Sequence, residues 1–159
     1  MAHFGRWGSL PLARVSHMFD VLNQVSVAAL IGPKDPGERE YAARHFALLS
    51  PSDLVLLDRG YPAFWLFALI LAQGAHFCAR MPVGVWNEVD QFVASGLREQ
   101  VLDLYPCAVA KPECQTRNLS TQPLRVRLVR IELDSREVEV LITSLLDSEE
   151  YPYAVFKEL

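Results

Sequence analysis

Apolar and polar residues in the first sixty positions follow patterns that predict strands and a helix. Apolar and β-branched residues dominate 13–22 and 25–31, and the polar pair between these segments predicts a β-hairpin. Helical spacing of apolar residues predicts a helix over 38–49. The apolar run within 53–58 predicts a strand covered on both faces, and such strands lie at the centre of a sheet.

The pattern that follows predicts a β-α-β unit. Residues 62–72 are apolar on nearly every side and predict a buried helix, and residues 75–81 predict a second strand. Because the loops are short, the handedness rule predicts a right-handed crossover between parallel strands. The longest apolar run, Ala63 to Ala72, has ten residues, whereas a membrane-spanning helix needs about 20. We therefore expect no contact with a membrane.

The second half of the chain has a less regular pattern. Residues 86–94 predict a short helix, and a final short helix is expected near Tyr153. The segment 104–123 is rich in Pro, Cys, Asn, Thr and Ser, which predicts an extended excursion.

A second hairpin is predicted by alternating apolar and charged residues. The alternation runs through 124–133 and 137–143, with a short polar connection between the two segments. The doublet Leu128 and Val129 breaks the alternation and predicts a β-bulge or a twist.

The composition indicates one domain with a sizeable core. The chain has 159 residues, of which 51% are hydrophobic, and no secretory signal is predicted at its N-terminus. Cys78, Cys107 and Cys114 form an odd, widely spaced set, so we expect reduced thiols and a cytoplasmic location. The formal net charge of −4 argues against a free-standing nucleic-acid-binding module, because such modules carry a basic excess.

Asp58 is the most informative candidate for chemistry. It ends the strand predicted at 53–58, and ligands of parallel α/β sheets gather beyond the carboxyl ends of strands. A carboxylate there holds a divalent metal through its oxygen atoms. The alternative is that Asp58 caps the next helix or closes a turn. The local pattern leaves both interpretations open.

Six segments resemble, in the same order, the core of DDE transposases of the fourth insertion-sequence family. The most specific of them contains the motif Leu-Leu-Asp-Arg-Gly-Tyr at 56–61. The segments cover most of the chain and lie at 13–16 with 20–23, 38–45, 54–62, 74–80, 126–130 and 138–143.

The resemblance implies an α/β fold with a ribonuclease H-like mixed sheet and flanking helices. The fold would be incomplete here and would carry a β-rich insertion in its second half. The implied divisions of a partial catalytic domain are a core at 1–81, the insertion at 82–145 and the start of a return to the core at 146–159.

The resemblance also implies a catalytic triad of Asp, Asp and Glu that binds two Mg²⁺ or Mn²⁺ ions. Asp58 matches the second aspartate of the family and is the expected catalytic residue and metal ligand. Two metals about 3.5–4 Å apart need several carboxylates to neutralise them. In the family, the first aspartate would precede Met1 and the glutamate would follow Leu159, so we expect this chain to be inactive alone.

No other acidic residue is expected to replace the missing carboxylates. Asp20 matches a non-catalytic aspartate of the family and is interpreted as a strand-end or turn residue. Asp53 would lie at the opposite end of its strand, roughly 16 Å from Asp58. Glu149 and Glu150 are interpreted as solvated loop residues.

Basic residues concentrate at 111–130, which holds five basic residues and one acidic residue. In the family this region belongs to the insertion near DNA, which implies phosphate contacts for Arg125, Arg127 and Arg130. The alternative is a solvated strand face with cross-strand pairs such as Arg130 with Glu139, and the two interpretations stay equal.

Two further residues, Arg59 and Tyr61, lie beside Asp58 in the motif and are candidates to approach a DNA strand. Trp86 is interpreted as a core residue, and the alternative is that its ring stacks on a base. No metal-ligand spacing is found among the histidines, which are His3, His17, His45 and His76.

The expected family function is metal-dependent DNA cleavage and strand transfer at the terminal repeats of a mobile element. The alternative is a non-enzymatic remnant that binds DNA or transposase subunits. An open sheet edge at the hairpin 13–31 would favour a homodimer or a contact with a transposase subunit. The expected location is the bacterial cytoplasm, with nucleoid association when DNA is bound.

Overall fold

A computed structural model describes residues 5–7, 10–133, 135 and 137–158. The architecture is mixed α/β, as expected, and the chain forms two compact units, Met1–Leu49 and Ser50–Leu159. We call these the N-terminal unit and the C-terminal unit. His3 and the turn positions 134 and 136 lie outside the described residues.

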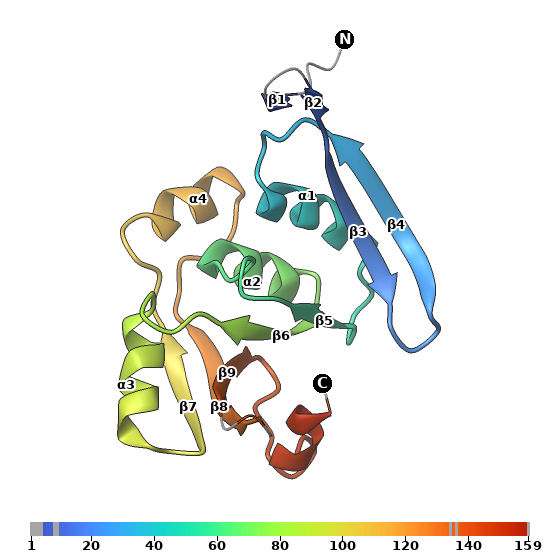
Figure 1. Ribbon diagram of the computed structural model, residues 1–159. Helices are drawn as coiled ribbons and strands as arrows, with labels where there is room; N and C mark the ends of the chain where they lie inside the picture. Colours follow the sequence, from blue (N-terminus) through green and yellow to red (C-terminus); the bar gives the residue numbers. More distant parts are fainter. Residues whose placement is uncertain (1–4, 8–9, 134, 136, 159) are drawn as a thin grey trace. The chain divides into compact units, whose positions relative to one another are not determined.

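The N-terminal unit is built on the first predicted hairpin (Figure 1), which the structure confirms. Two antiparallel strands pack one face against a helix, where the hydroxyl of Ser16 lies 3.1 Å from Nε2 of the buried His45. Tyr41 is also buried and donates a hydrogen bond to the carbonyl of Pro33. Its elements are β1 (Gly5–Trp7), β2 (Leu10–Leu12), β3 (Arg14–Asp20), β4 (Val25–Gly32), α1 (Glu38–His45) and the 3₁₀ helix η1 (Phe46–Leu48).

The opposite face of the β3–β4 hairpin is open to solvent. Val15 lies opposite Ile31 in the strand register, and both side chains are exposed, as is Phe19. The register shifts between Met18 and Phe19, which places a bulge in this hairpin.

The C-terminal unit contains a five-stranded mixed sheet with the order β5-β6-β9-β8-β7. β5 and β6 are parallel and are joined through α2, so the predicted β-α-β unit is confirmed, and the other neighbours are antiparallel. The implied boundary between a core at 1–81 and an insertion at 82–145 does not divide this sheet, because β9 pairs with β6. Its strands are β5 (Leu54–Leu57), β6 (His76–Met81), β7 (Glu99–Leu104), β8 (Leu124–Glu132) and β9 (Val138–Thr143).

One face of this sheet packs against helices. The apolar helix α2 (Phe64–Ala72) is buried on nearly all sides, and Phe67 stacks on Phe77 of β6 with ring centroids 4.3 Å apart. The helix α3 (Asn87–Ser95) buries Val89 and Phe92. α4 (Ala110–Thr116) lies against α2 (Figure 1).

The other face packs against the C-terminal segment. Phe156, on the 3₁₀ helix η2 (Tyr153–Lys157), joins a core cluster with Cys78, Leu141 and Val129. The short terminal helix expected near Tyr153 is therefore present.

β5 differs from the prediction of a central, doubly covered strand. It is an edge strand of the five-stranded sheet, and Leu54 and Leu56 are exposed while Leu57 is buried. The reason is that alternate side chains point to opposite faces, and only the face beneath α2 is covered at this strand.

Two features of the second half differ from the sequence prediction. Of the bulge or twist predicted at Leu128 and Val129, the bulge is absent, because β8 is buried on both faces at these positions and its register with both neighbours is continuous. The segment 104–123, which was predicted to be extended, contains the helix α4, and the buried side chain of Cys114 anchors this helix. The segment begins where a strand that was not predicted, β7, ends.

Candidate functional site

Asp58 lies directly after β5, at the carboxyl end of the strand. Its backbone carbonyl accepts a hydrogen bond from the N–H of Tyr61, so the residue closes a turn. The carboxylate does not cap α2, because Ala63 occupies the N-cap position. The side chain is 69% exposed. The turn interpretation is therefore confirmed and the cap interpretation is wrong.

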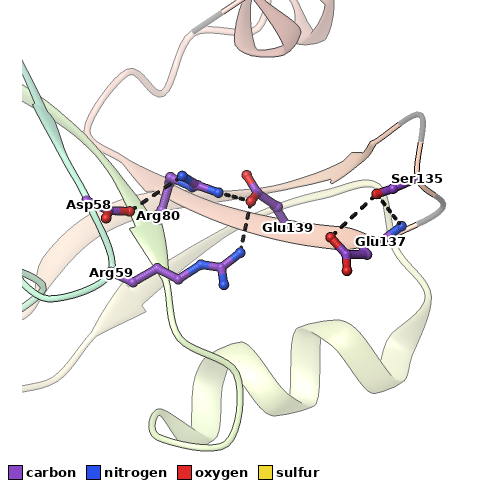
Figure 2. A network of polar contacts seen from close by, with 6 residues as sticks. All are labelled: Asp58, Arg59, Arg80, Ser135, Glu137 and Glu139. Carbon is purple, nitrogen blue, oxygen red and sulfur yellow. Dashed lines mark hydrogen bonds and ion pairs between the residues drawn. The ribbon is translucent and has the colours of Figure 1, made fainter.

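Asp58 belongs to a network of four charged residues (Figure 2), together with Arg59, Arg80 and Glu139. Nη1 of Arg80 lies 3.5 Å from Oδ1 of Asp58, and the same guanidinium donates to Glu139 through Nη2. Arg59 donates to the same oxygen of Glu139 at 2.8 Å. The two positive and the two negative charges of the network thus balance, and Arg80 contacts both carboxylates.

Arg80 keeps its positive charge in this network. The hydrogen bond to Glu139 raises the pKa of Arg80, and the charges of Glu139 and Asp58 add to this effect against a smaller opposing effect of burial. Asp58 therefore faces a permanent cation.

The described residues do not fit a two-metal centre. They include no group of three or more His, Cys, Asp or Glu side chains arranged to hold a metal. The second carboxylate near Asp58 is Glu139, and the guanidinium of Arg80 contacts both. Two metals need several carboxylates free to coordinate them, so this arrangement supports no two-metal chemistry by itself.

Glu139 and Arg80 were missed by the sequence interpretation. One of the two open interpretations paired Glu139 with Arg130, but the register places Arg130 opposite Val140 and Glu139 opposite Ile131. The two charged side chains therefore project from opposite faces of the sheet. The alternation of apolar and charged residues along the two strands does not fix their register to within one residue.

Arg125 and Arg130 differ in environment. Arg125 is 55% exposed and pairs with Asp103 on β7 at 3.1 Å. Arg130 is half-buried, and its Nη1 lies 3.4 Å from the carbonyl of Val93. Arg125 is therefore the more accessible of these two candidates for a phosphate contact.

Arg127 is buried, so the expectation that it contacts DNA is wrong for this structure. Its side chain is 2% exposed, and its guanidinium donates to Glu99 and to the carbonyl of Tyr151. It also lies over the ring of Phe156, 5.0 Å from the centroid. The residue links β7, β8 and the C-terminal segment.

The positive charge counted at 111–130 is largely paired. Arg117 pairs with Glu113 four residues earlier, and Arg125 and Arg127 pair with acids of β7. The sequence count missed the β7 acids because they lie outside the counted window and in an unpredicted strand.

Arg59 and Tyr61 flank the turn of Asp58. The side chain of Arg59 is 54% exposed, although it pairs with Glu139, and Tyr61 is half-buried. Trp86 is half-buried too and lies near Phe67, with ring centroids 6.4 Å apart.

The other acids considered in the sequence, Asp20, Asp53, Glu149 and Glu150, lie at strand ends or in turns. Asp20 accepts hydrogen bonds from the backbone and side chain of Asn23, which lower the pKa of Asp20. Asp53 accepts a bond from the N–H of Ser50 before β5 begins. Glu149 and Glu150 are exposed turn residues.

Comparisons with models of protein families, with curated proteins and with solved structures found no match for the chain. Among the described residues, no helix is long and apolar enough to cross a membrane.

Proposed function

We propose that the chain is part of a transposase-like protein with a ribonuclease H-like core, and that it binds DNA without cleaving it by itself. The observation behind this proposal is the position of Asp58 at the carboxyl end of β5, in a parallel β5-α2-β6 unit. This is where α/β sheets place their functional groups.

The absence of cleavage follows from the surroundings of Asp58. Strand cleavage by two metals requires several carboxylates around the metal pair. Here Asp58 and Glu139 share the guanidinium of Arg80, whose charge opposes a divalent cation.

A nicking assay tests this part of the proposal. The chain is incubated with supercoiled plasmid and either Mg²⁺ or Mn²⁺, and we expect no conversion to open circles above a protein-free control. Asp58→Ala is expected to behave identically. Metal-dependent nicking by the unmodified chain that disappears in Asp58→Ala would contradict it.

DNA binding is supported by exposed guanidiniums at two places in the C-terminal unit. Arg125 and Arg59 are both more than half exposed, and arginine is well suited to phosphate contacts. The neighbouring acids weaken the field around both residues, so we expect modest, sequence-independent and salt-dependent affinity.

Fluorescence anisotropy of a labelled duplex across a salt series tests the binding. We expect log affinity to fall linearly with log salt, and Arg125→Ala to reduce the slope by about one. The matched control is Asp103→Asn, which removes the partner of Arg125 and is expected to strengthen binding. No binding even at low salt would refute this part of the proposal.

A second candidate function is favoured by the open face of the β3–β4 hairpin. Val15, Phe19 and Ile31 are exposed there, and a two-stranded sheet with one uncovered apolar face is suited to a protein contact. This candidate is a non-enzymatic subunit-binding role, in which another protein chain covers the open face of the hairpin.

A further inference from the structure

A pocket of about 400 Å³ lies in the C-terminal unit, apart from the network around Asp58. Three segments distant in sequence form it: the end of α3 with the residues after it, β8, and η2. The residues lining it are Gly96, Arg98, Arg130, Glu132, Tyr153 and Lys157.

The ring of Tyr153 organises the pocket. The guanidinium carbon of Arg98 lies 3.7 Å from the ring centroid, and Nζ of Lys157 lies 5.7 Å from it. The Tyr153 hydroxyl donates to the carbonyl of Arg130 at 2.8 Å. The backbone N–H of Arg130 donates in turn to the carbonyl of Arg98. The cations are thus held around one ring by contacts between the three segments.

The charge of the pocket is not balanced. Among the described residues, three cationic side chains line it against one carboxylate, Glu132, which is 73% exposed and lies 3.9 Å from Nε of Arg130. Within the described part of the chain, neither Arg98 nor Lys157 forms an ion pair with a carboxylate. The described lining residues therefore give the pocket an excess of two positive charges.

We propose that this pocket binds a phosphomonoester in its dianionic form. The excess charge of the pocket matches that of the dianion, and guanidinium and ammonium groups donate the charge-assisted hydrogen bonds that phosphate oxygens accept. The volume admits a phosphate together with part of the molecule that carries it. This inference is independent of the transposase-like function proposed above.

The source of the phosphomonoester is either a small phosphorylated molecule or the 5′-phosphate end of a nucleic acid. Both present the same oxyanion. The probes therefore include phenyl phosphate and a short single-stranded oligonucleotide with and without its 5′-phosphate.

Calorimetric titration of the whole chain with phenyl phosphate, at pH 7.5 and constant ionic strength, measures the binding. We expect saturable binding that weakens about tenfold in Arg98→Ala and in Lys157→Ala, the usual effect of losing one hydrogen bond to a charged group. Glu132→Gln is expected to strengthen binding, because it removes the one carboxylate. The matched control, Lys111→Ala at an exposed position of α4, is expected to bind as the unmodified chain does.

Two further measurements distinguish a dianion site from a general anion surface. Affinity should fall between pH 7.5 and pH 5, because a phosphomonoester takes up a proton near pH 6. Dimethyl phosphate, a monoanionic diester, should bind at least about tenfold more weakly than phenyl phosphate. Tighter binding of the 5′-phosphorylated oligonucleotide than of its unphosphorylated form would assign the site to nucleic-acid ends. Binding of phenyl phosphate without that difference would assign it to small molecules.

The proposal fails if phenyl phosphate shows no saturable binding, if the diester binds equally well, or if Lys111→Ala weakens binding as much as Arg98→Ala. Loss of the Arg98 contact with Tyr153 also affects packing, so Arg98→Lys, which keeps the charge, is measured beside it. Thermal melting of each variant shows whether it is folded. Arg98→Lys should retain most of the affinity.

Discussion

At the residue scale, Arg125 and Arg127 show that burial decides the role of a charged side chain. They lie two positions apart on the same face of β8. Arg125 is exposed with one partner, Asp103, while Arg127 is enclosed by Glu99 and the C-terminal segment. Arg125 is accessible to a phosphate, whereas Arg127 stabilises the packing of β7, β8 and the C-terminal segment.

Replacement of Arg127 by Ala should lower the free energy of unfolding substantially. Breaking a fully buried ion pair costs about 3–5 kcal/mol, and the 29% exposure of Glu99 reduces our expectation to roughly 2–3 kcal/mol. Urea denaturation followed by circular dichroism measures it. Arg125→Ala is the control and should stay within about 0.5 kcal/mol. Equal stability of the two variants would mean that Arg127 has no structural role.

The three cysteines should differ in reactivity. Burial raises the pKa of the Cys78 thiol to about 12, and burial also raises the pKa of Cys114. Cys107 is exposed. Because the thiolate is the reactive form, iodoacetamide at pH 8 should modify Cys107 alone in the folded chain.

Mass spectrometry of the alkylated chain locates the modification. In denaturant all three thiols should react, which controls for the reagent. Rapid modification of Cys78 in the folded chain would show that the β6 core opens on the timescale of the reaction.

At the element scale, the packing of α2 on β6 anchors the candidate site. Phe67 is fully buried and its ring stacks on Phe77, one strand away from the end of β5. The helix needs no capping side chain at its start, because its apolar surface is buried on nearly all sides. Packing therefore decides the stability of the β5-α2-β6 unit.

Replacement of Phe67 by Ala should cost about 3–5 kcal/mol of unfolding free energy through lost burial and the cavity left behind. Chemical denaturation measures it. Leu69→Ala, at a half-buried position of the same helix, is the control and should cost clearly less. A smaller effect at Phe67 than at Leu69 would contradict the packing described for α2.

At the scale of the whole molecule, the N-terminal unit keeps an apolar surface open. In the described part of the chain, β3 and β4 pair only with each other, and Val15, Phe19 and Ile31 remain exposed on one face. Unpaired strand edges and exposed apolar faces favour pairing with another chain. We therefore propose that a second copy covers this face.

Sedimentation velocity at increasing protein concentration should show reversible self-association of the unmodified chain. Val15→Lys and Ile31→Lys place charges on the open face and should shift the chain to monomer. Leu48→Lys, at an exposed position of η1, is the control and should leave association unchanged. A monodisperse monomer at all concentrations would refute the association.

The elements with strong local patterns were predictable. The helix α1, the β5-α2-β6 unit and both hairpins follow from periodicity and turn residues within short windows. The ion pairs of the β7 acids Glu99 and Asp103 were not predictable, because their arginine partners lie on the neighbouring strand, distant in sequence. The α4 helix was missed because its stability comes from docking its buried Cys114 side rather than from local propensity.

The sequence by itself determined the two hairpins, the helix α1 and the β5-α2-β6 unit with Asp58 at the end of a strand, because these features depend on local patterns of side chains. The tertiary structure decided what Asp58 faces, which arginines are buried and where charges gather without partners. These properties depend on strand register and on contacts between distant segments, such as Arg80 with Glu139 or Arg98 with Tyr153. A shift of one residue in register would turn Arg80 or Glu139 to the opposite face of the sheet, and no local pattern records that choice.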